Sequence, residues 1–481
     1  MNMQKNDTIA AIATALSDSG IGIIRISGSE AISVANSVFC SKSGKRKLQN
    51  VDSHTIHYGY IVDIDSNENV LPEDWQRHII DEVMVAIMKA PRSYTTEDTV
   101  EINCHGGVLV MQKILESVLR HGARIAEPGE FTKRAFLNGR IDLSKAEAVI
   151  DIIHSQNEFA LTSSVNQLKG SLSAEIKRLR EQIIYEIAFI ESALDDPEHI
   201  SLEGYPEGLN EKTDMLLKSI KKLLDTADNG RLIKEGISTV IVGKPNAGKS
   251  SLLNILVGEE RAIVTGIAGT TRDVLQESIK LHGIGLNIID TAGIHKTEDT
   301  VEKIGVEKAK QYAADADLIL YVVDASVELD ESDREIISLI GDKNTIVLLN
   351  KSDLAPVVEE KNLRELMEKM LPKHKQIAMI PTSTKDNSGI DVFENTIKEM
   401  FFQGELKSNN EIIITNMRHK EALQNAYDSL IMVKKSIETG MPEDFYSIDL
   451  MSAYSSLGFI IGEEVDDDLV EEIFSKFCMG K

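Results

Sequence analysis

The chain has 481 residues, of which 42% are hydrophobic and 27% are charged, and its formal net charge is −25. This composition supplies enough apolar material for several cores, and the acidic balance argues against broad non-specific binding of nucleic acid while leaving room for a local basic surface. Three cysteines without paired spacing suggest neither a disulfide framework nor a zinc site. With no secretory pattern and no apolar run of ~18–20 residues, we expect a cytosolic protein.

The first part of the chain, up to about residue 140, has a mixed α/β pattern. Alternating apolar residues predict short strands, and apolar residues at three- and four-residue spacing predict helices. The strands are expected at 21–26, 54–62, 82–88 and 99–103, and the helices at 29–39 and 107–121.

From residue 143 to 230 the pattern changes to helices. Residues 171–194 carry apolar side chains at helical spacing over about six turns, and residues 209–224 repeat the pattern. Pro197 and Pro206 are expected to lie in the connection between these two helices. A helix-rich segment therefore leads into the next part of the chain.

Near-continuous apolar runs then return at residues 238–242, 286–290, 318–324 and 345–350. Such runs are typical of parallel strands that are buried on both faces, and helical patterns separate them. We therefore expect a doubly wound α/β domain that ends near Phe402. After it the chain is again helical, at 416–439, 445–462 and 469–477, with an acidic solvated face at 463–472.

The first of these strands is followed by a glycine-rich loop, Gly243 to Ser250, and then by a helical pattern. The spacing of the loop fits G-x-x-x-x-G-K-[ST], whose backbone N–H groups surround a phosphate. Lys249 adds a positive charge near the β- and γ-phosphates, and Ser250 offers a hydroxyl to Mg²⁺. The loop therefore predicts nucleotide binding.

Other motifs follow at strand ends in the order that a GTPase requires. Asp290 to Gly293 can hold Mg²⁺ through water and contact the γ-phosphate, and Thr270–Thr271 supplies a hydroxyl for Mg²⁺. In the segment Asn350 to Asp353, the carboxylate of Asp353 can accept from both guanine N–H groups, which adenine does not present. The segment Ser383 to Lys385 can close over the base. The nucleotide is predicted to be GTP.

Ile294 follows the Asp290 to Gly293 motif, at a position where small GTPases often have a glutamine that orients water. An aliphatic side chain cannot form that hydrogen bond. Either hydrolysis is slow, or another group, such as a carboxylate within residues 298–307, performs this role.

The chain as a whole resembles the MnmE (TrmE) family of tRNA-modification GTPases. The resemblance covers essentially the full length, and its specific marks are the segments 22–28, 94–101, 105–107 and 128–138 and the terminal Cys478 to Lys481. It implies a GTPase that, with the FAD- and NADH-using partner MnmG (GidA), adds an aminomethyl or carboxymethylaminomethyl group to carbon 5 of the tRNA wobble uridine. A homodimer and a heterotetramer with MnmG are implied as well.

The resemblance also implies a one-carbon donor, 5-formyl- or methylene-tetrahydrofolate, bound by the N-terminal domain, which dimerises. The implied folate contacts are Arg25, Glu101, Arg140 and Lys481. Arg140 stands where the family often has lysine, which keeps the charge but changes the geometry. Cys478, beside the terminal lysine, is a candidate catalytic residue.

For hydrolysis, the resemblance implies activation by dimerisation of the G domains, with K⁺ in place of an arginine finger. Asn246 would bind K⁺ together with carbonyl groups of the 265–270 loop, and Glu302 would position water. His295 stands where a relative can carry arginine, and Met479 is an apolar change in the terminal motif.

The predicted GTP contacts are Asn246, Ala247, Gly248, Lys249, Ser250, Ser251, Thr265, Gly266, Ile267, Ala268, Gly269, Thr270, Thr271, Asp290, Thr291, Ala292, Gly293, Asn350, Lys351, Ser352, Asp353, Ser383, Thr384 and Lys385. The predicted Mg²⁺ ligands are Ser250 and Thr271, and the predicted K⁺ ligands are Asn246, Thr265, Ile267 and Thr270.

The expected architecture has three parts. Residues 1–138 form the folate-binding α/β domain, residues 139–235 and 403–481 pair as one helical domain, and residues 236–402 are the inserted G domain. Insertion of the G domain explains why helical segments flank it in the sequence. It also predicts that the first and last residues of the G domain lie close together.

Two other function classes remain open at this point. A ribosome-assembly or regulatory GTPase would switch partners without modifying RNA and would need no folate pocket. A structural partner with slow hydrolysis would respond equally to Na⁺ and K⁺.

Overall fold

The computed structural model describes residues 7–43, 45, 48–64, 75–259, 276–281, 284–290, 312–371, 377–402, 412–463 and 465–480. The chain forms two compact units. The first comprises Met1–Ile150, Gln167–Ile184 and Tyr454–Lys481, and the second comprises Asp151–Asn166 and Tyr185–Ala453.

The first unit contains a seven-stranded sheet in the order β3-β4-β5-β6-β2-β1-β7, and only the β1–β7 pairing is parallel among the strands described there. The strands are β1 (Ile9–Ile12), β2 (Ser19–Ser27), β3 (Phe39–Ser41), β4 (Thr55–Val62), β5 (Ile79–Met88), β6 (Thr99–Gly106) and β7 (Arg124–Ile125). The accompanying helices are α1 (Ala31–Val38), the 3₁₀ turn η1 (Trp75–His78), α2 (Val108–Arg120) and α3 (Glu130–Leu137).

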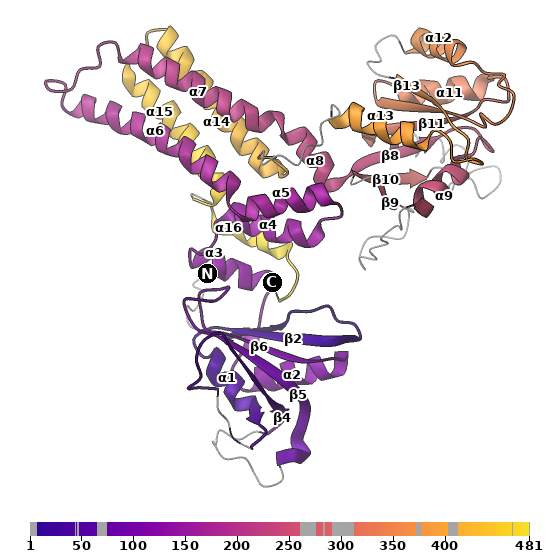
Figure 1. The fold of residues 1–481 in the computed structure, drawn as a ribbon. Coiled ribbons are helices and arrows are strands. Elements are labelled where there is room, and N and C mark those ends of the chain that lie inside the picture. Colours follow the sequence, from indigo (N-terminus) through magenta and orange to yellow (C-terminus); the bar gives the residue numbers. More distant parts are fainter. Residues whose placement is uncertain are drawn as a thin grey trace. The chain divides into compact units, whose positions relative to one another are not determined.

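Helices α1 and α2 bury one face of this sheet (Figure 1). Alternate residues of the strands, such as Ile24, Val85 and Ile102, meet Ile114 of α2 in a shared core. This is the pattern expected for an antiparallel sheet with one buried face. Val100 and Ile102 of β6 both point into that core, so the intervening Glu101 lies on the other face, where it faces Arg25 of β2.

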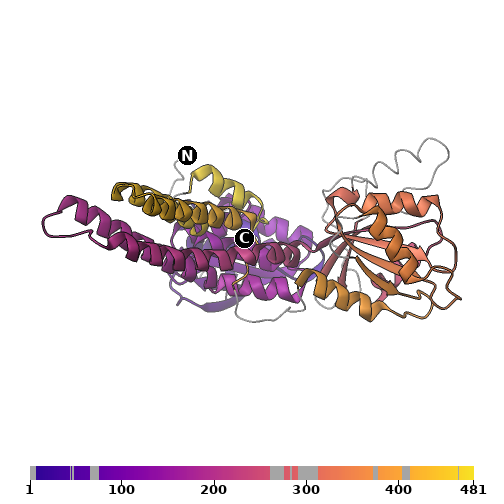
Figure 2. The same cartoon turned by 90° about the horizontal axis from the view of Figure 1, so that it is seen from above.

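The long helices are α4 (Leu143–His154), α5 (Glu158–Leu168), α6 (Ser171–Asp195), α7 (Tyr205–Asp225), α8 (Ala227–Glu235), α14 (Met417–Glu438), α15 (Glu443–Ile461) and α16 (Asp467–Ser475). Figures 1 and 2 show α7 and α14 side by side along their lengths. In the first unit, Leu143 and Ala146 of α4 pack against Val470 and Phe474 of α16. Segments that lie more than 300 residues apart in the sequence therefore share a helical core.

The second unit contains a six-stranded sheet in the order β13-β12-β11-β8-β10-β9. Its strands are β8 (Ile237–Val242), β9 (Gln276–Leu281), β10 (Ile284–Asp290), β11 (Leu318–Asp324), β12 (Asn344–Asn350) and β13 (Ile377–Pro381), and its helices are α9 (Lys249–Glu259), α11 (Glu331–Ile340), α12 (Glu360–Met370) and α13 (Ile390–Phe402). Among the described strands of this sheet, all pairings are parallel except that of β9 with β10.

The strands of this sheet are apolar on both faces because helices cover both. In β11, Leu318 and Leu320 join a core with α9 and α13, whereas Ile319 and Tyr321 join a second core with α11 and α12. The predicted doubly wound α/β fold is confirmed. Outside this region, the Ile414 N–H, before α14, donates to the Thr226 hydroxyl, before α8, across 3.1 Å.

Several local expectations were wrong. Pro206 does not lie in a connection but in the first turn of α7, where a proline is tolerated because its missing N–H has no helical partner. The strands β1, β3, β7 and β9 and the helix α3 were not predicted. Among the described residues, no helix is both long enough and apolar enough to cross a lipid bilayer.

Candidate functional site

The glycine-rich loop lies between the end of β8 and the start of α9, as predicted. The ammonium group of Lys249 donates to the carbonyl groups of Gly243 and Lys244 at 2.6 and 2.8 Å. The lysine is therefore folded back over the loop, and only 9% of it is exposed. A positive charge and the N-terminal N–H groups of α9 meet here, which is the arrangement that binds a phosphate.

The loop packs too closely to accept side chains at its glycines. At Gly248, with a φ of +105°, an added Cβ would lie 2.0 Å from Nδ2 of Asn350. At Gly243, an added Cβ would lie 2.4 Å from the carbonyl oxygen of Val322. The residues present therefore fit a phosphate group held by the main chain.

Asn350, at the end of β12, connects the two parts of the predicted nucleotide site. Its side-chain nitrogen donates to the Ala247 carbonyl at 2.8 Å, and its side-chain oxygen accepts from the Thr384 N–H at 3.2 Å. Asn350 is 1% exposed. The phosphate loop, the predicted guanine motif and the loop after β13 are thus held together by one buried amide.

The predicted base-binding residues gather around Asp353. One carboxylate oxygen accepts from the Ser383 hydroxyl at 3.1 Å, and the other lies 3.9 Å from the ammonium of Lys385. Lys351, whose φ is +64°, donates to Asp324 of β11 across 2.5 Å. The loop is therefore anchored to β11, with Asp353 beside the Ser383 segment.

This salt bridge also affects ionisation at the end of β11. Burial by itself would raise the pKa of Asp324, but hydrogen bonds from Lys351 and Ser326 outweigh burial and lower that pKa. Asp324 therefore stays ionised as a partner for Lys351.

Sequence reasoning missed the residues that fix the first part of the loop. Lys244 contacts Asp330 at 3.0 Å and Asp333 at 2.7 Å, and Asp333 also accepts from the Tyr321 hydroxyl at 2.9 Å. Asp330 and Asp333 form the capping box of α11. The D-x-x-D spacing before an apolar run was a usable signal for that cap, but nothing local pointed to Lys244.

Other predicted nucleotide and hydrolysis residues lie outside the described residues, and so does the terminal folate residue. These are Thr265, Gly266, Ile267, Ala268, Gly269, Thr270, Thr271, Thr291, Ala292, Gly293, Ile294, His295, Glu302 and Lys481. Of the predicted metal ligands, Ser250 lies in the first turn of α9, and Asn246 is an exposed loop residue with a φ of +62°.

A second group of predicted residues lies in the first unit. The Arg25 Nε donates to the Glu101 carboxylate across 2.9 Å, and the same guanidinium donates to the Gly480 carbonyl at 3.0 Å. The Arg25 guanidinium also lies 5.6 Å from the ring centre of Phe131. The fold thus brings Arg25, Glu101 and the segment before the C-terminus together.

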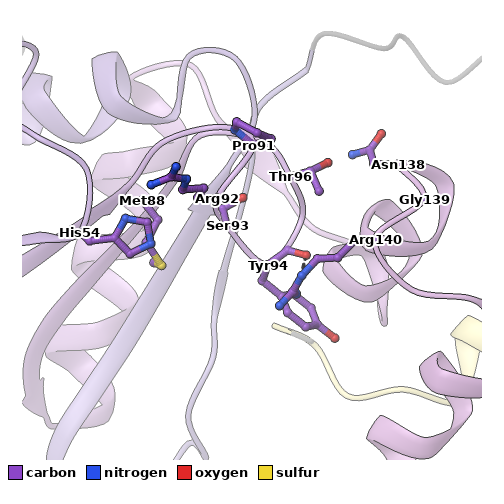
Figure 3. Close-up of a pocket in the computed structure, with 10 residues that line it drawn as sticks. All are labelled: His54, Met88, Pro91, Arg92, Ser93, Tyr94, Thr96, Asn138, Gly139 and Arg140. Atoms are coloured by element: carbon purple, nitrogen blue, oxygen red, sulfur yellow. Dashed lines mark hydrogen bonds between the residues drawn. The ribbon is translucent and has the colours of Figure 1, made fainter. Parts of the chain in front are cut away.

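Arg140 lines a nearby cavity of about 600 Å³ (Figure 3). It donates to the Tyr94 carbonyl at 2.8 Å, and its guanidinium lies 4.8 Å from the centre of the Tyr94 ring. Tyr94 in turn packs against the apolar cluster that contains Phe131. The two predicted folate arginines therefore contact aromatic rings, Phe131 and Tyr94, that pack in the same apolar cluster, although Arg25 does not line the cavity.

The cysteines differ in their surroundings. Cys40 and Cys104 are buried, whereas Cys478 is exposed. Burial raises the pKa of the Cys104 thiol to about 11, which makes that thiol unreactive at neutral pH. Within the part of the chain that is described, no group of three or more His, Cys, Asp or Glu side chains could hold a metal ion.

Comparison with known proteins gives a consistent result. A family model described as "MnmE helical domain" matches residues 143–478, and one described as "GTP-binding protein TrmE N-terminus" matches residues 8–140. Three curated relatives bear the name tRNA modification GTPase MnmE. The protein of Lachnoclostridium phytofermentans is 58% identical, over 99% of this chain and 100% of its own length. That of Clostridioides difficile is 50% identical over 99% of both chains, and that of Acetivibrio thermocellus is 48% identical over 100% of both.

Proposed function

This chain belongs to the MnmE family of tRNA-modification GTPases. From that premise we propose the reaction in which it takes part and the role of each of its domains. The protein is a GTP hydrolase of tRNA modification. We propose that it acts with the FAD- and NADH-using partner MnmG in a heterotetramer. Together they add an aminomethyl or carboxymethylaminomethyl group to carbon 5 of the wobble uridine.

The observation that carries the GTPase assignment is the position of Asn350. Its buried amide bridges the phosphate loop at Ala247 and the Thr384 segment, and Asp353 follows in the same turn. A carboxylate there accepts from the two N–H groups of guanine, which adenine lacks. Ser250 and Thr271 would hold Mg²⁺, which neutralises charge on the phosphates when it is bound.

For hydrolysis, the proposal is a site completed by a second copy of the chain. Ile294 cannot orient water, so another group is needed, and Glu302 is the proposed residue. Asn246 supports a K⁺ site because it is exposed at the edge of the phosphate loop in a left-handed backbone conformation. The other proposed K⁺ ligands are carbonyl groups of Thr265, Ile267 and Thr270. A cation beside the phosphates would stabilise charge in the transition state.

The one-carbon donor is proposed to be 5-formyl- or methylene-tetrahydrofolate, bound in the first unit. Support comes from the Arg25–Glu101 pair and from Arg140 on Tyr94. A carboxylate paired with a guanidinium suits the donor and acceptor edge of a pterin, and a cation suits a glutamate carboxylate. Lys481 would add a second cation, and Cys478 is the proposed reactive thiol.

We also propose the three-domain division at residues 1–138, 139–235 with 403–481, and 236–402, in a homodimer. In this arrangement GTP hydrolysis moves the G domains and orders the modification site, because the phosphate loop carries no group for one-carbon chemistry.

The decisive experiment is mass spectrometry of wobble uridines in tRNA from cells that lack this chain. Loss of the modification supports the proposal, and unchanged modification contradicts it in favour of a regulatory or ribosome-assembly GTPase. Hydrolysis rates in K⁺ and Na⁺ test the cation separately, since equal rates would contradict the K⁺ site.

A further inference from the structure

The cavity beside Arg140 has an unusual charge for so acidic a chain. Ten residues line it, among them the basic residues His54, Arg92 and Arg140 (Figure 3). No aspartate or glutamate is among these ten. In a protein with a formal net charge of −25, a cavity whose lining carries basic side chains and no acidic ones favours an anionic ligand.

The basic side chains lie at separate places along the cavity. Figure 3 shows His54 and Arg92 toward one end and Arg140 with Tyr94 toward the other. The Arg140 end is fixed by its stacking on Tyr94, whose hydroxyl is bonded to Thr132 across 2.9 Å. The cavity therefore suits an extended ligand with several anionic groups rather than a single small ion.

The backbone around the cavity is strained. His54 and Thr96 both line it, and both have a φ of +63°. Positive φ is rare for residues other than glycine, and a β-branched threonine tolerates it poorly. Of the three other such residues in the described part of the chain, Asn246 and Lys351 belong to the nucleotide site. Strained residues concentrate at binding sites, which supports the cavity as one.

We infer that this cavity binds the oligo-γ-glutamyl tail of the folate, with Arg92 and His54 as a subsite beyond Arg140. The inference rests on the proposed folate function. Each tail residue adds a carboxylate, and a guanidinium can donate two parallel hydrogen bonds to a carboxylate. The tail would run from the Arg140 end toward Arg92, which is exposed and reachable from solvent.

The test compares 5-formyltetrahydrofolate carrying one or five glutamates, using the full chain, isothermal calorimetry and low salt. The pentaglutamate is expected to bind about tenfold more tightly than the monoglutamate, and added salt should reduce that ratio. Arg92→Gln should lower the ratio to about twofold, and Arg92→Glu should lower it further. Lys113→Gln, which removes an exposed charge of α2 outside the cavity, is the matched control.

The outcomes separate the subsite from the folate assignment. Equal binding of the two forms by the unaltered chain, or an unchanged ratio in both Arg92 variants, overturns the subsite and leaves the folate site standing. No binding of either form overturns both. If Arg92→Gln instead weakens tRNA binding and leaves the glutamate ratio unchanged, the cavity binds phosphate and the inference is wrong.

Discussion

The side-chain amide of Asn350 donates to the main-chain carbonyl of Ala247 across 2.8 Å, and this bond joins the predicted base-binding segment to the predicted phosphate-binding loop. The two residues lie on different strand–loop connections, at the carboxyl ends of β12 and β8. Because the amide is buried, its contribution does not depend on solvent screening. We expect the bond to set the spacing between the phosphate loop and the segment proposed to bind the base.

Asn350→Ala should weaken GTP binding without unfolding the domain. It leaves the Ala247 carbonyl and the Thr384 N–H without their partner, and each unpaired buried group costs about 1–3 kcal/mol. We expect the Kd for GTP to rise by roughly 10²-fold, measured by fluorescence of a labelled nucleotide. Asn362→Ala, on the exposed surface of α12, should change nothing. A similar Kd in both variants would contradict the bridging role.

Gly248→Ala should abolish nucleotide binding, because the added methyl group would clash with Asn350 and distort the phosphate loop. The added methyl group would lie 2.0 Å from the Asn350 nitrogen, and the φ of +105° disfavours alanine. The control is Gly258→Ala in α9, where nothing lies within 4 Å and helix propensity favours alanine by about 1 kcal/mol. We expect the control to bind GTP normally with a slightly raised melting temperature. Normal binding by Gly248→Ala would show that the loop is less closely packed.

Asp353→Asn should change the preferred base of the nucleotide from guanine to xanthine. Asparagine offers one acceptor and one donor, so it pairs poorly with the two N–H groups of guanine but can donate to the 2-oxo group of xanthine. We expect GTP hydrolysis at limiting substrate to fall by roughly 10²-fold and xanthosine triphosphate to become the better substrate. Competition between the two nucleotides measures this directly. Retained GTP preference would mean that Asp353 does not contact the base.

The sequence was most informative where one local pattern decides the structure. The run 318–324 is apolar throughout because β11 is covered on both faces, and its predicted bounds are those of the strand. In contrast, β9 is an edge strand that, among the described strands, pairs with β10 alone, and its residues carried no continuous apolar signal. The pairing of Lys244 with Asp333 is a tertiary contact and has no local signature. Similarly, the motif positions were predictable, but the Asn350–Ala247 bond was not.

Acid should destabilise the first unit through Asp7 and Glu130. Burial alone would raise the pKa of each, but hydrogen bonds from Arg124 and Arg134 outweigh it and lower both. A lowered pKa in the folded state means that the stabilisation is complete above the unfolded values, near 3.8 and 4.5, and is lost as pH falls below them. The urea concentration at the midpoint of unfolding should therefore decrease as the pH is lowered below about 5. Unfolding can be followed by the fluorescence of Trp75, the one tryptophan of the chain.

Glu130→Gln tests this dependence because Glu130 is 1% exposed and contacts both arginines. Removing its charge should cost about 3 kcal/mol at pH 7 and flatten the acid dependence. The exposed Glu116→Gln should shift stability by less than about 0.5 kcal/mol at either pH. An unaltered acid slope in Glu130→Gln would assign the pH dependence to other carboxyl groups.

Gly129→Ala should disturb the C-terminal segment that reaches Arg25. Gly129 precedes α3 with a φ of +69°, and an added Cβ would lie 2.5 Å from the Phe474 carbonyl oxygen in α16. Its N–H also donates to the Cys478 carbonyl at 3.4 Å. The methyl group would therefore push α16 and the residues after it away from α3, and with them the Gly480 carbonyl that Arg25 contacts.

The control separates this clash from backbone strain. Gly204→Ala has nearly the same φ, +73°, but nothing within 4 Å of the new methyl group, so it carries only the strain of about 1–2 kcal/mol. We expect Gly129→Ala to speed amide hydrogen exchange in α16 and to weaken binding of 5-formyltetrahydrofolate about tenfold, whereas Gly204→Ala does neither. If both variants bind folate as the unaltered chain does, while the amides of α16 exchange faster in Gly129→Ala, the C-terminal segment after α16 does not form part of the folate site. If α16 exchange is also unaltered, the segment tolerates the methyl group by local adjustment, and its packing against Gly129 is looser than the distances indicate.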